Sequence, residues 1–284
     1  MFQFKAKQKE YKLGKYKVGG VPGENPTALA GTIFYAGQKH IFKNQNKGII
    51  NKNYTEKLIN QLEVQADKTN LTPLLDVLVL NEKLIEPILD FVFSITQVPI
   101  LIDAPIFELK IPMINYVIEH GLDEKVIYNT ITSESFDAEL QLLSQTKIKT
   151  YVLLAIESTH WTTHARIKAI ENLINRVKSF EFYKNQLLID TCVIDFTSLG
   201  LALNAIYEVK DKMGFPSGCS AHNLADVWIN LEKKFGKIWK SIKIVSSTIT
   251  LTAGADFIFY GPVQLSNIIF PVVSLLNISF SHVT

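Results

Sequence analysis

The stretch PLLDVLVLNEKLIEPILDFVFSITQVPILID, residues 73–103, holds the repeat on which the chain is built. It begins and ends with a short aliphatic run, PLLDVLV (residues 73–79) and PILID (residues 99–103), and a segment with helical spacing lies between them. A run that is apolar at nearly every position is typical of a strand covered on both faces. The stretch therefore predicts a strand–helix–strand unit with parallel strands.

The same alternation continues in both directions along the chain. The further runs are TALAGTIFY (27–35), KVIYN (125–129), YVLLAIE (151–157), QLLID (186–190), GFPSGC (214–219) and DFIFY (256–260). Eight such units predict a (β/α)₈ TIM barrel, and an open doubly wound sheet is the main alternative. Because no linker rich in Pro, Gly or Ser interrupts the pattern, we expect a single domain over residues 1–284.

Local patterns predict several further elements. Residues 2–18 alternate lysines with apolar side chains around Gly14, which favours an N-terminal β-hairpin lid. Asn53 with Glu56 has the spacing of a helix cap pair. Helical periodicity is clear in two sets of residues: Ile167, Ile170, Ile174 and Val177, and Leu224, Val227, Trp228 and Leu231.

Composition bounds the class of protein. The chain has 284 residues, of which 47% are hydrophobic, and its 29 basic and 27 acidic residues leave a net charge of +2. That balance is unlike a nucleic-acid-binding protein, so we expect no nucleic-acid partner. Two cysteines, Cys192 and Cys219, and the absence of an apolar leader near the start favour the cytoplasm. Polar residues and Pro271 interrupt the apolar residues 265–280, which we interpret as a helix of a soluble protein.

Polar side chains stand where the predicted strands end. Asp103, Asn129, Glu157 and Asp190 close four successive runs, and Ser220, His222 and Asn223 follow the seventh. Burying a carboxylate after an aliphatic run is costly unless it has a partner. In a barrel these positions gather at the carboxyl-terminal ends of the strands, where active sites lie. We therefore predict a ligand site there, although helix capping accounts for some of these residues.

The residue types suggest the ligand's chemistry. Carboxylates accept hydrogen bonds, whereas the Asn129 and Asn223 amides both donate and accept them. A planar heterocycle with an amino-pyrimidinone edge, such as a reduced pterin, matches that set. Phosphate binding is not favoured, because the glycines at Gly19-Gly20 and Gly218 lack the Lys-Ser/Thr that follows in a P-loop.

One long motif gives the chain a family resemblance. GGVPGENPTALAGTIFYAGQKHI (residues 19–41) strongly resembles the N-terminal signature of the H subunit of tetrahydromethanopterin S-methyltransferase. PILIDAP, KVIYNTI, QLLIDT, GFPSGCSAHN and GADFIFYGP resemble that family in the same order. Corrinoid:tetrahydrofolate methyltransferases are relatives of this family, and the motifs do not separate the two groups.

The resemblance implies a pterin-binding barrel that moves a methyl group between N5 of a tetrahydropterin and the cobalt of a corrinoid. By position, Asp103 and Asn129 would bind the pterin, Asn223 would hydrogen-bond near N5, and Asp190 would match the Asp that closes the sixth strand. Asn223 and Asp190 are thus the expected catalytic residues. Glu157 lies where a further pterin contact is expected, but the match weakens there, and residues 159–165 have no family counterpart.

The resemblance also implies partners. The corrinoid would be carried by a partner protein, other subunits would belong to a membrane-associated complex with this chain at its periphery, and the chain would form a homodimer. The methyl donor, the acceptor and the direction of transfer stay open, as does the choice between tetrahydromethanopterin and tetrahydrofolate.

Three other functions compete with this one. In a zinc-dependent thiol methyltransferase, Cys192, Cys219 and His222 would hold the metal, but no Cys-x-x-Cys pair exists, and we expect no bound metal. A non-catalytic docking subunit for a corrinoid protein would not require Asp103, Asn129 and Asn223. An enzyme of the dihydropteroate synthase type would need a basic pyrophosphate site, which the strand ends do not supply.

Overall fold

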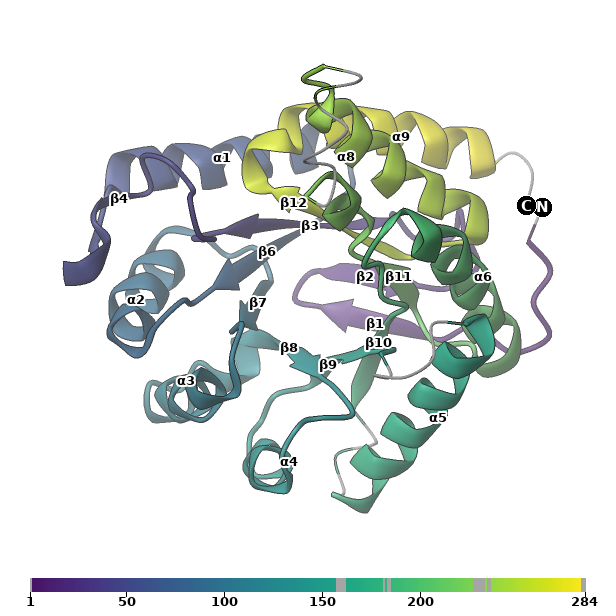
Figure 1. The fold of residues 1–284 in the computed structure, drawn as a ribbon, viewed down its shortest axis with the longest axis horizontal. Helices are drawn as coiled ribbons and strands as arrows, with labels where there is room; N and C mark the ends of the chain where they lie inside the picture. Colours follow the sequence, from purple (N-terminus) through teal and green to yellow (C-terminus); the bar gives the residue numbers. More distant parts are fainter. Residues whose placement is uncertain are drawn as a thin grey trace.

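Eight parallel strands close into a barrel in the computed structural model, which describes residues 2–156, 162–180, 182, 185–226, 233 and 236–281 (Figure 1). The strands pair in chain order, and the last pairs with the first through Phe257 and Ala28. Each predicted run overlaps one of them, so the predicted TIM barrel is confirmed. The strands are β3 (Ala28–Ile33), β6 (Thr72–Leu78), β7 (Ile100–Asp103), β8 (Val126–Ile131), β9 (Thr150–Leu154), β10 (Gln186–Asp190), β11 (Ser217–Cys219) and β12 (Phe257–Pro262).

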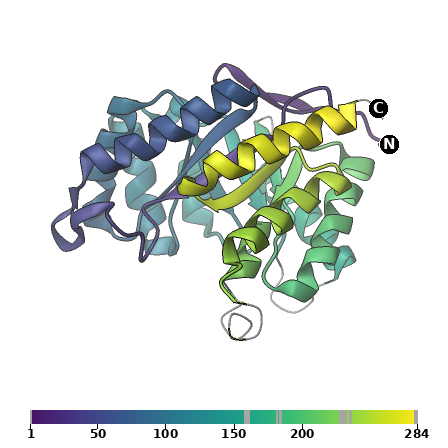
Figure 2. The same ribbon diagram turned by 90° about the horizontal axis from the view of Figure 1, so that it is seen from above.

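Helices surround the strands, as the alternating pattern predicts (Figure 1). They are α1 (Lys52–Thr69), α2 (Ile85–Ile95), α3 (Phe107–Glu119), α4 (Asp137–Ser144), α5 (Thr163–Ser179), α6 (Phe196–Met213), α8 (Trp239–Thr248) and α9 (Ser266–Ser281). The two-stranded sheet of β4 (Phe42–Asn44) and β5 (Ile49–Ile50) precedes α1. Helix α9 lies beside α1 (Figure 2). The Phe280 ring near the end of α9 packs edge-on against the Phe2 ring, so the two ends of the chain lie close together.

The helix predictions have mixed outcomes. The periodic residues Ile167 to Val177 lie in α5, with Ile167, Ile170 and Val177 buried. The predicted cap at Asn53 is wrong, because α1 already begins at Lys52 and Asn51 is the N-cap residue. Leu224 lies in a short 3-10 helix, Ala221–Ala225, and not in the predicted α-helix. Val227, Trp228 and Leu231 lie outside the described residues.

The predicted hairpin is present and closes the amino-terminal end of the barrel. Its strands β1 (Glu10–Leu13) and β2 (Tyr16–Gly19) are antiparallel, and Leu13 and Val18 are buried in the cluster that fills the barrel interior. The Thr72 hydroxyl, at the start of β6, donates to the carbonyl of Lys17. Gly19 has a φ of +95°, and a Cβ there would lie 2.2 Å from the carbonyl oxygen of Lys9, so the close return of the chain requires glycine.

The carboxy-terminal helix is more apolar than its neighbours. Within the described residues, the segment Val263–Ser281 is long and apolar enough to cross a membrane by length and composition, and 33% of it is buried against the barrel. Ile269, Phe270 and Val273 of α9 are buried, whereas Leu275 and Ile278 are 67% and 57% exposed. One face of the helix therefore packs on the barrel and another carries exposed apolar side chains.

A buried ion pair joins the segments at which the barrel closes. Lys210 of α6 donates from Nζ to both carboxylate oxygens of Asp256, at 2.7 Å each, and to the carbonyl of Gly20 at 3.0 Å. The Asp256 carboxylate also accepts from the backbone N–H of Ser217 in β11, and its carbonyl accepts from the N–H of Ala28 in β3. Both side chains are almost fully buried, so each charge depends on the other.

We expect Lys210→Met to lower the free energy of unfolding at pH 7 by about 3–5 kcal/mol, because it leaves the Asp256 carboxylate buried without its cation. Urea denaturation measures the change. Lys212→Met is the matched control, because Lys212 lies on the same helix with its side chain 55% exposed. Equal losses in the two variants would contradict the role given to the ion pair.

Candidate active site

A cavity of about 620 Å³ opens at the carboxyl-terminal ends of the strands. It contains three predicted site residues, Asp103, Asn129 and Asn223. Of the described residues that line it, Lys243 is the only lysine or arginine. The full lining is Thr32, Tyr35, Ala36, Asp76, Leu78, Asp103, Asn129, Ser220, His222, Asn223, Asp226, Trp239, Lys243, Phe259, Gly261 and Pro262.

Asp76 links three strands at one wall of the cavity. Its carboxylate accepts from the Thr32 hydroxyl of β3 at 2.7 Å and from the Asn129 amide of β8 at 3.2 Å. Asp103 lies on β7, the strand between β6 and β8, and pairs in register with Leu78 of β6 and Asn129 of β8. Asp76 was not predicted from the sequence, because it stands inside an aliphatic run and not at its end. The signal was present all the same, since a buried carboxylate in such a run also needs partners.

The two carboxyls hold protons more tightly than exposed ones. Burial raises the pKa of Asp76 to about 6, although the bonds from Thr32 and Asn129 oppose the rise. Burial, and then the charge of Asp76, raises the pKa of Asp103 well above its usual range, while Lys110 opposes this rise. The Asp103 carboxyl therefore takes up a proton more readily than an exposed carboxyl does, and in its protonated form it can donate as well as accept a hydrogen bond.

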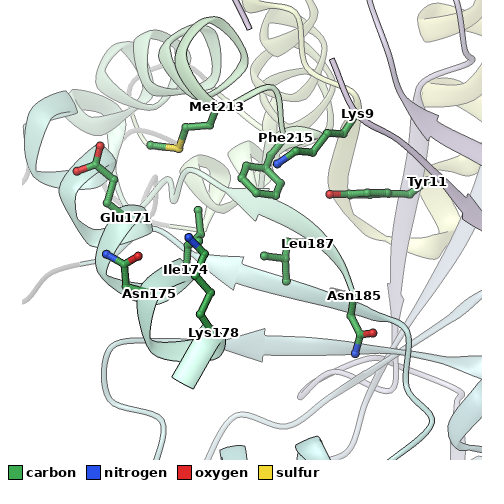
Figure 3. Close-up of a pocket in the computed structure, with 10 residues that line it drawn as sticks. All are labelled: Lys9, Tyr11, Glu171, Ile174, Asn175, Lys178, Asn185, Leu187, Met213 and Phe215. Carbon is green, nitrogen blue, oxygen red and sulfur yellow. The ribbon is translucent and has the colours of Figure 1, made fainter. Parts of the chain in front are cut away.

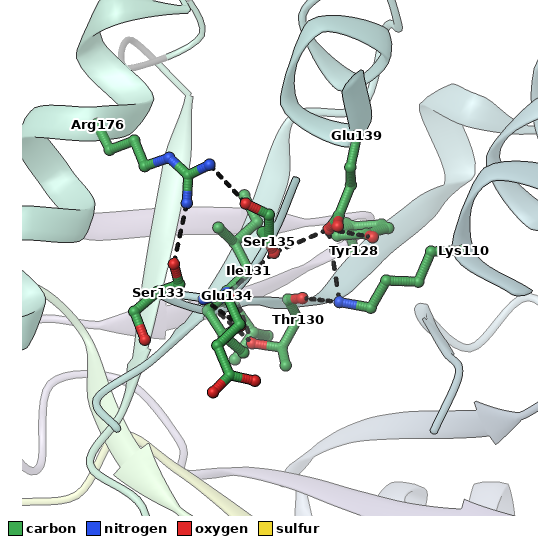
Figure 4. A network of polar contacts seen from close by, with 11 residues as sticks. Lys110, Tyr128, Thr130, Ile131, Ser133, Glu134, Ser135, Glu139 and Arg176 are labelled. Carbon is green, nitrogen blue, oxygen red and sulfur yellow. Dashed lines mark hydrogen bonds and ion pairs between the residues drawn. The ribbon is translucent and has the colours of Figure 1, made fainter. Parts of the chain in front are cut away.

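A polar network behind β8 supports this wall (Figure 4). Lys110 of α3 donates to the carbonyl of Thr130 at 2.7 Å and lies 3.4 Å from the carboxylate of Glu139 in α4. Glu139 also accepts from the hydroxyls of Tyr128 and Ser135. Because Thr130 follows Asn129 directly, these contacts fix the backbone that presents the Asn129 amide.

The loop after β8 is held from the other side by α5 (Figure 4). Arg176 donates to the carbonyls of Ser133 and Ser135 and to the carboxylate of Asp137. The guanidinium therefore ties α5 to the loop between β8 and α4 and to the first residue of α4. This strand end is thus anchored from two neighbouring helices.

The opposite wall carries a histidine, a lysine and an aspartate. The Nδ1–H of His222 donates to the carbonyl of Phe259 at 2.8 Å, which leaves Nε2 as an acceptor. Burial, and then the charge of Lys243, lowers the pKa of His222 to about 4, so the ring is neutral at pH 7. Lys243 of α8 is buried, donates to the His222 carbonyl at 3.3 Å and pairs with Asp226 at 3.0 Å. Lys243 and Asp226 were not predicted as site residues, because they follow no strand directly.

The two residues expected to be catalytic occupy different positions. Asn223 lines the cavity, and its amide makes a long bond of 3.4 Å to the carbonyl of Val193. Asp190 does not line the cavity: it is buried behind Ser220, whose hydroxyl donates to it at 3.1 Å. It also accepts from the N–H of Cys192 at 2.7 Å. Asp190 is therefore linked to the cavity only indirectly, through its hydrogen bond from Ser220, which does line it.

Two other sequence predictions concern Glu157 with its following loop and the zinc-site alternative. Glu157 and residues 159–161 of the following loop lie outside the described residues. Within the part of the chain that the structure describes, no three His, Cys, Asp or Glu side chains are grouped to hold a metal ion. Cys192 and Cys219 are buried, and burial raises the pKa of the Cys192 thiol to about 12.

Comparison with known proteins identifies the family. The model of the tetrahydromethanopterin S-methyltransferase MtrH subunit matches residues 6–284. The chain belongs to this family. It is 30% identical to the H subunit of the tetrahydromethanopterin S-methyltransferase of Methanothermobacter thermautotrophicus, over 99% of this chain and 94% of the relative. It is 32% identical to the corresponding subunit of Methanopyrus kandleri, over 98% and 92%.

Solved structures support the fold of this family member. A dihydropteroate synthase from Xanthomonas albilineans in complex with 7,8-dihydropteroate has a TM-score of 0.62 and 11% identity, over 92% of this chain and 95% of that one. A Yersinia pestis dihydropteroate synthase with a pterine-sulfa conjugate has a TM-score of 0.60 and 13% identity, over 96% and 100%. At this identity the likeness establishes a common barrel fold and leaves the site's chemistry to be argued from this chain.

Asp190 should make stability depend on pH. Burial raises the pKa of Asp190 from 3.8 to about 6, so the folded chain binds the proton more tightly than the unfolded chain. The protonated Asp190 therefore stabilises the fold at low pH, and this stabilisation is lost as pH rises from about 4 to about 6. We therefore expect the free energy of unfolding of Asp190→Asn, relative to that of the parent, to rise by about 2–3 kcal/mol between pH 4 and pH 7. Urea denaturation at both pH values measures this, with the exposed Asp67→Asn as control. A stability difference independent of pH would contradict the assignment.

Proposed function

We propose that this chain transfers a methyl group between N5 of a tetrahydropterin and a corrinoid carried by a partner protein. Membership of the methyltransferase subunit family supports the reaction class. The observation that carries the proposal is the wall formed by Asp76, Asp103 and Asn129, which lies in a cavity at the active end of a barrel.

The donors and acceptors of this wall suit a pterin edge. Within the described residues, the Asp103 carboxyl receives a hydrogen bond from the backbone N–H of Ala104 and no side chain donates to it. A buried carboxyl with unused acceptor capacity favours a ligand that brings N–H donors. The amino group and the ring N–H of an amino-pyrimidinone are such donors. The Asn129 amide, which both donates and accepts, can pair with a donor or an acceptor on the same ring. Glu157 stays a prediction as a further contact.

Methyl transfer from N5 needs a change of charge at that nitrogen. A tertiary amine expels its methyl group poorly until the nitrogen accepts a proton or a strong hydrogen bond. Asn223 can both donate and accept, and its weak bond to Val193 is easily exchanged for one to the ligand. Asp190 would orient Ser220 beside it. The corrinoid cobalt supplies the nucleophile or the methyl group when it is bound, so this chain needs no nucleophilic residue.

The partners follow from the family. The relatives are named as subunits, which supports assembly with other subunits. We propose that one of these carries the corrinoid and that this chain lies on the cytoplasmic side, at the periphery of a membrane-associated complex. The exposed Leu275 and Ile278 on α9 offer apolar contact area for such an assembly. Homodimerisation stays a prediction.

Asp103→Ala should weaken binding of the N5-methylated pterin by about 1–3 kcal/mol, because it removes a buried partner of the ring. Calorimetric titration with methyl-tetrahydromethanopterin and methyl-tetrahydrofolate measures the loss and also separates the two pterins. Asp67→Ala, an exposed carboxylate on α1, is the control. Thermal melting checks that the variant is folded, and unchanged affinity would remove Asp103 from the site.

Asn223→Ala should lower the rate of methyl transfer more than it lowers pterin affinity. A hydrogen bond that strengthens as charge develops at N5 lowers the barrier to transfer, and proton-transfer assistance typically raises the rate by about 10²–10⁴. Single-turnover transfer from the methylated pterin to free cob(I)alamin measures the rate. Equal rates in variant and parent would defeat this role. If the folded parent protein neither binds the pterin nor transfers its methyl group, the result would favour the docking-subunit alternative.

A further inference from the structure

A second pocket lies at the amino-terminal end of the barrel, away from the active-site cavity. Figure 3 shows the residues that line it. Its volume is about 710 Å³, and it opens between the hairpin strand β1, helix α5 and the residues that precede β11. Leu187 at the start of β10 forms its base, which places the pocket at the amino-terminal ends of the strands. Its lining is Lys9, Tyr11, Glu171, Ile174, Asn175, Lys178, Asn185, Leu187, Met213 and Phe215.

The backbone of Lys9 is fixed from both sides. Its N–H donates to the carbonyl of Gly214 at 2.8 Å, and its carbonyl accepts from the N–H of Gly20 at 3.0 Å. Gly214 has a φ of +67°, and a Cβ there would lie 2.1 Å from the carbonyl oxygen of Lys7. The N-terminal segment can therefore run this close only beside glycine. Lys9 is thus held at the pocket's edge by backbone bonds to two distant segments.

Two lysines share the pocket without an acidic partner between them. Lys178 of α5 points into it from the other side, as Figure 3 shows. Among the described residues, no carboxylate lies within ion-pair distance of Lys9 or Lys178. Glu171 lies at the far edge, and its charge acts on Lys212. Burial, and then the charge of Lys178, lowers the pKa of Lys9 to about 8. An anion between the two lysines would relieve this repulsion.

The rest of the pocket is largely apolar. The Lys9 ammonium lies 2.9 Å from the centre of the Phe215 ring, and the Tyr11 ring stands beside it. Met213, Ile174 and Leu187 complete the surface, and the amides of Asn175 and Asn185 are its uncharged polar groups. An inorganic anion would use only the lysines and the amides. A ligand with an attached flat or aliphatic group would also cover the rings and the methionine.

We propose that this pocket binds a small organic anion, with a phosphate or carboxylate between Lys9 and Lys178 and an apolar group against Phe215 and Met213. The site lies beyond the methyl-transfer function and does not depend on it. Its occupant would join the hairpin to α5 and to the end of α6, three segments that are distant in sequence. Ligand bound to the folded chain alone stabilises it, so binding should raise the melting temperature.

Phenyl phosphate is the probe that tests both parts of the pocket, with inorganic phosphate and benzyl alcohol as its separate halves. Calorimetric titration should show tighter binding of phenyl phosphate than of either half. Phenylacetate replaces phosphate by carboxylate and identifies the preferred anion. Lys9→Gln and Lys178→Gln should each weaken the binding of phenyl phosphate by about tenfold or more, because each removes a charge-assisted hydrogen bond. Lys168→Gln, an exposed lysine on the same helix α5, should have no effect.

A second measurement does not depend on the variants. Brief acetylation followed by peptide mass mapping should show that phenyl phosphate slows modification of Lys9 and not of the exposed Lys7. The proposal is overturned if phenyl phosphate does not bind the unaltered protein, if Lys168→Gln weakens it as much as Lys9→Gln, or if Lys9 is not protected. Pterin titration of the same variants should be unchanged, which separates this site from the active-site cavity.

Discussion

The barrel closes around the carboxylate of Asp256. This side chain accepts from the Ser217 N–H of the seventh strand and pairs with Lys210 of α6, while the Asp256 carbonyl accepts from Ala28 of the first strand. A buried carboxylate without its cation is strongly destabilising, so the arrangement in which these segments meet at Asp256 is favoured over those in which they do not. A slip of one residue in β12 would also turn its buried side chains to the opposite face. The pair therefore fixes the register in which the first and last strands join, and with it which side chains point into the barrel.

The consequence of this register appears at the other end of the strands. Parallel strands deliver Asp76, Asp103 and Asn129 to one wall, and Asp190 behind Ser220 nearby. Few cations reach these carboxyls, because Lys243 pairs with Asp226 and Lys110 contacts the network behind β8. Burial is therefore the largest influence on each carboxyl, and it favours the protonated form. Such a wall offers carboxyl oxygens and an amide but, among the described residues, no cation paired directly with Asp76 or Asp103, which suits a heterocycle with N–H donors better than a phosphate.

The strand pattern sufficed for the barrel because most of its strands are nearly unbroken apolar runs; β11, Ser217–Cys219, is the exception and was found by its place in the repeat. It also sufficed for Asp103, Asn129 and Asn223, since a polar residue after such a run stands at the barrel mouth. Asp76 was missed because position within a strand does not reveal which side chains reach the cavity across neighbouring strands. Lys243 comes from a later helix, α8, and only packing brings it to the cavity. The cap predicted at Asn53 was wrong because α1 already begins at Lys52: the N–H of Asn51 donates to the Ile41 carbonyl, a contact outside the local pattern, and the Asn51 carbonyl accepts the first helical bond from Thr55.

The small net charge of +2 hides an uneven distribution along the barrel axis. Carboxyls gather at the active-site cavity, whereas Lys9 and Lys178 converge at the opposite pocket. Between the two ends lies a packed interior in which Leu13 and Val18 of the hairpin meet Leu74, Leu101 and Val152 of the strands. A packed barrel is not a pore, so ligands at the two ends share no volume. The hairpin is nevertheless part of both regions, because its side chains pack in the barrel interior and Lys9, just before its first strand, bonds through its backbone to Gly20 and Gly214 at the opposite pocket.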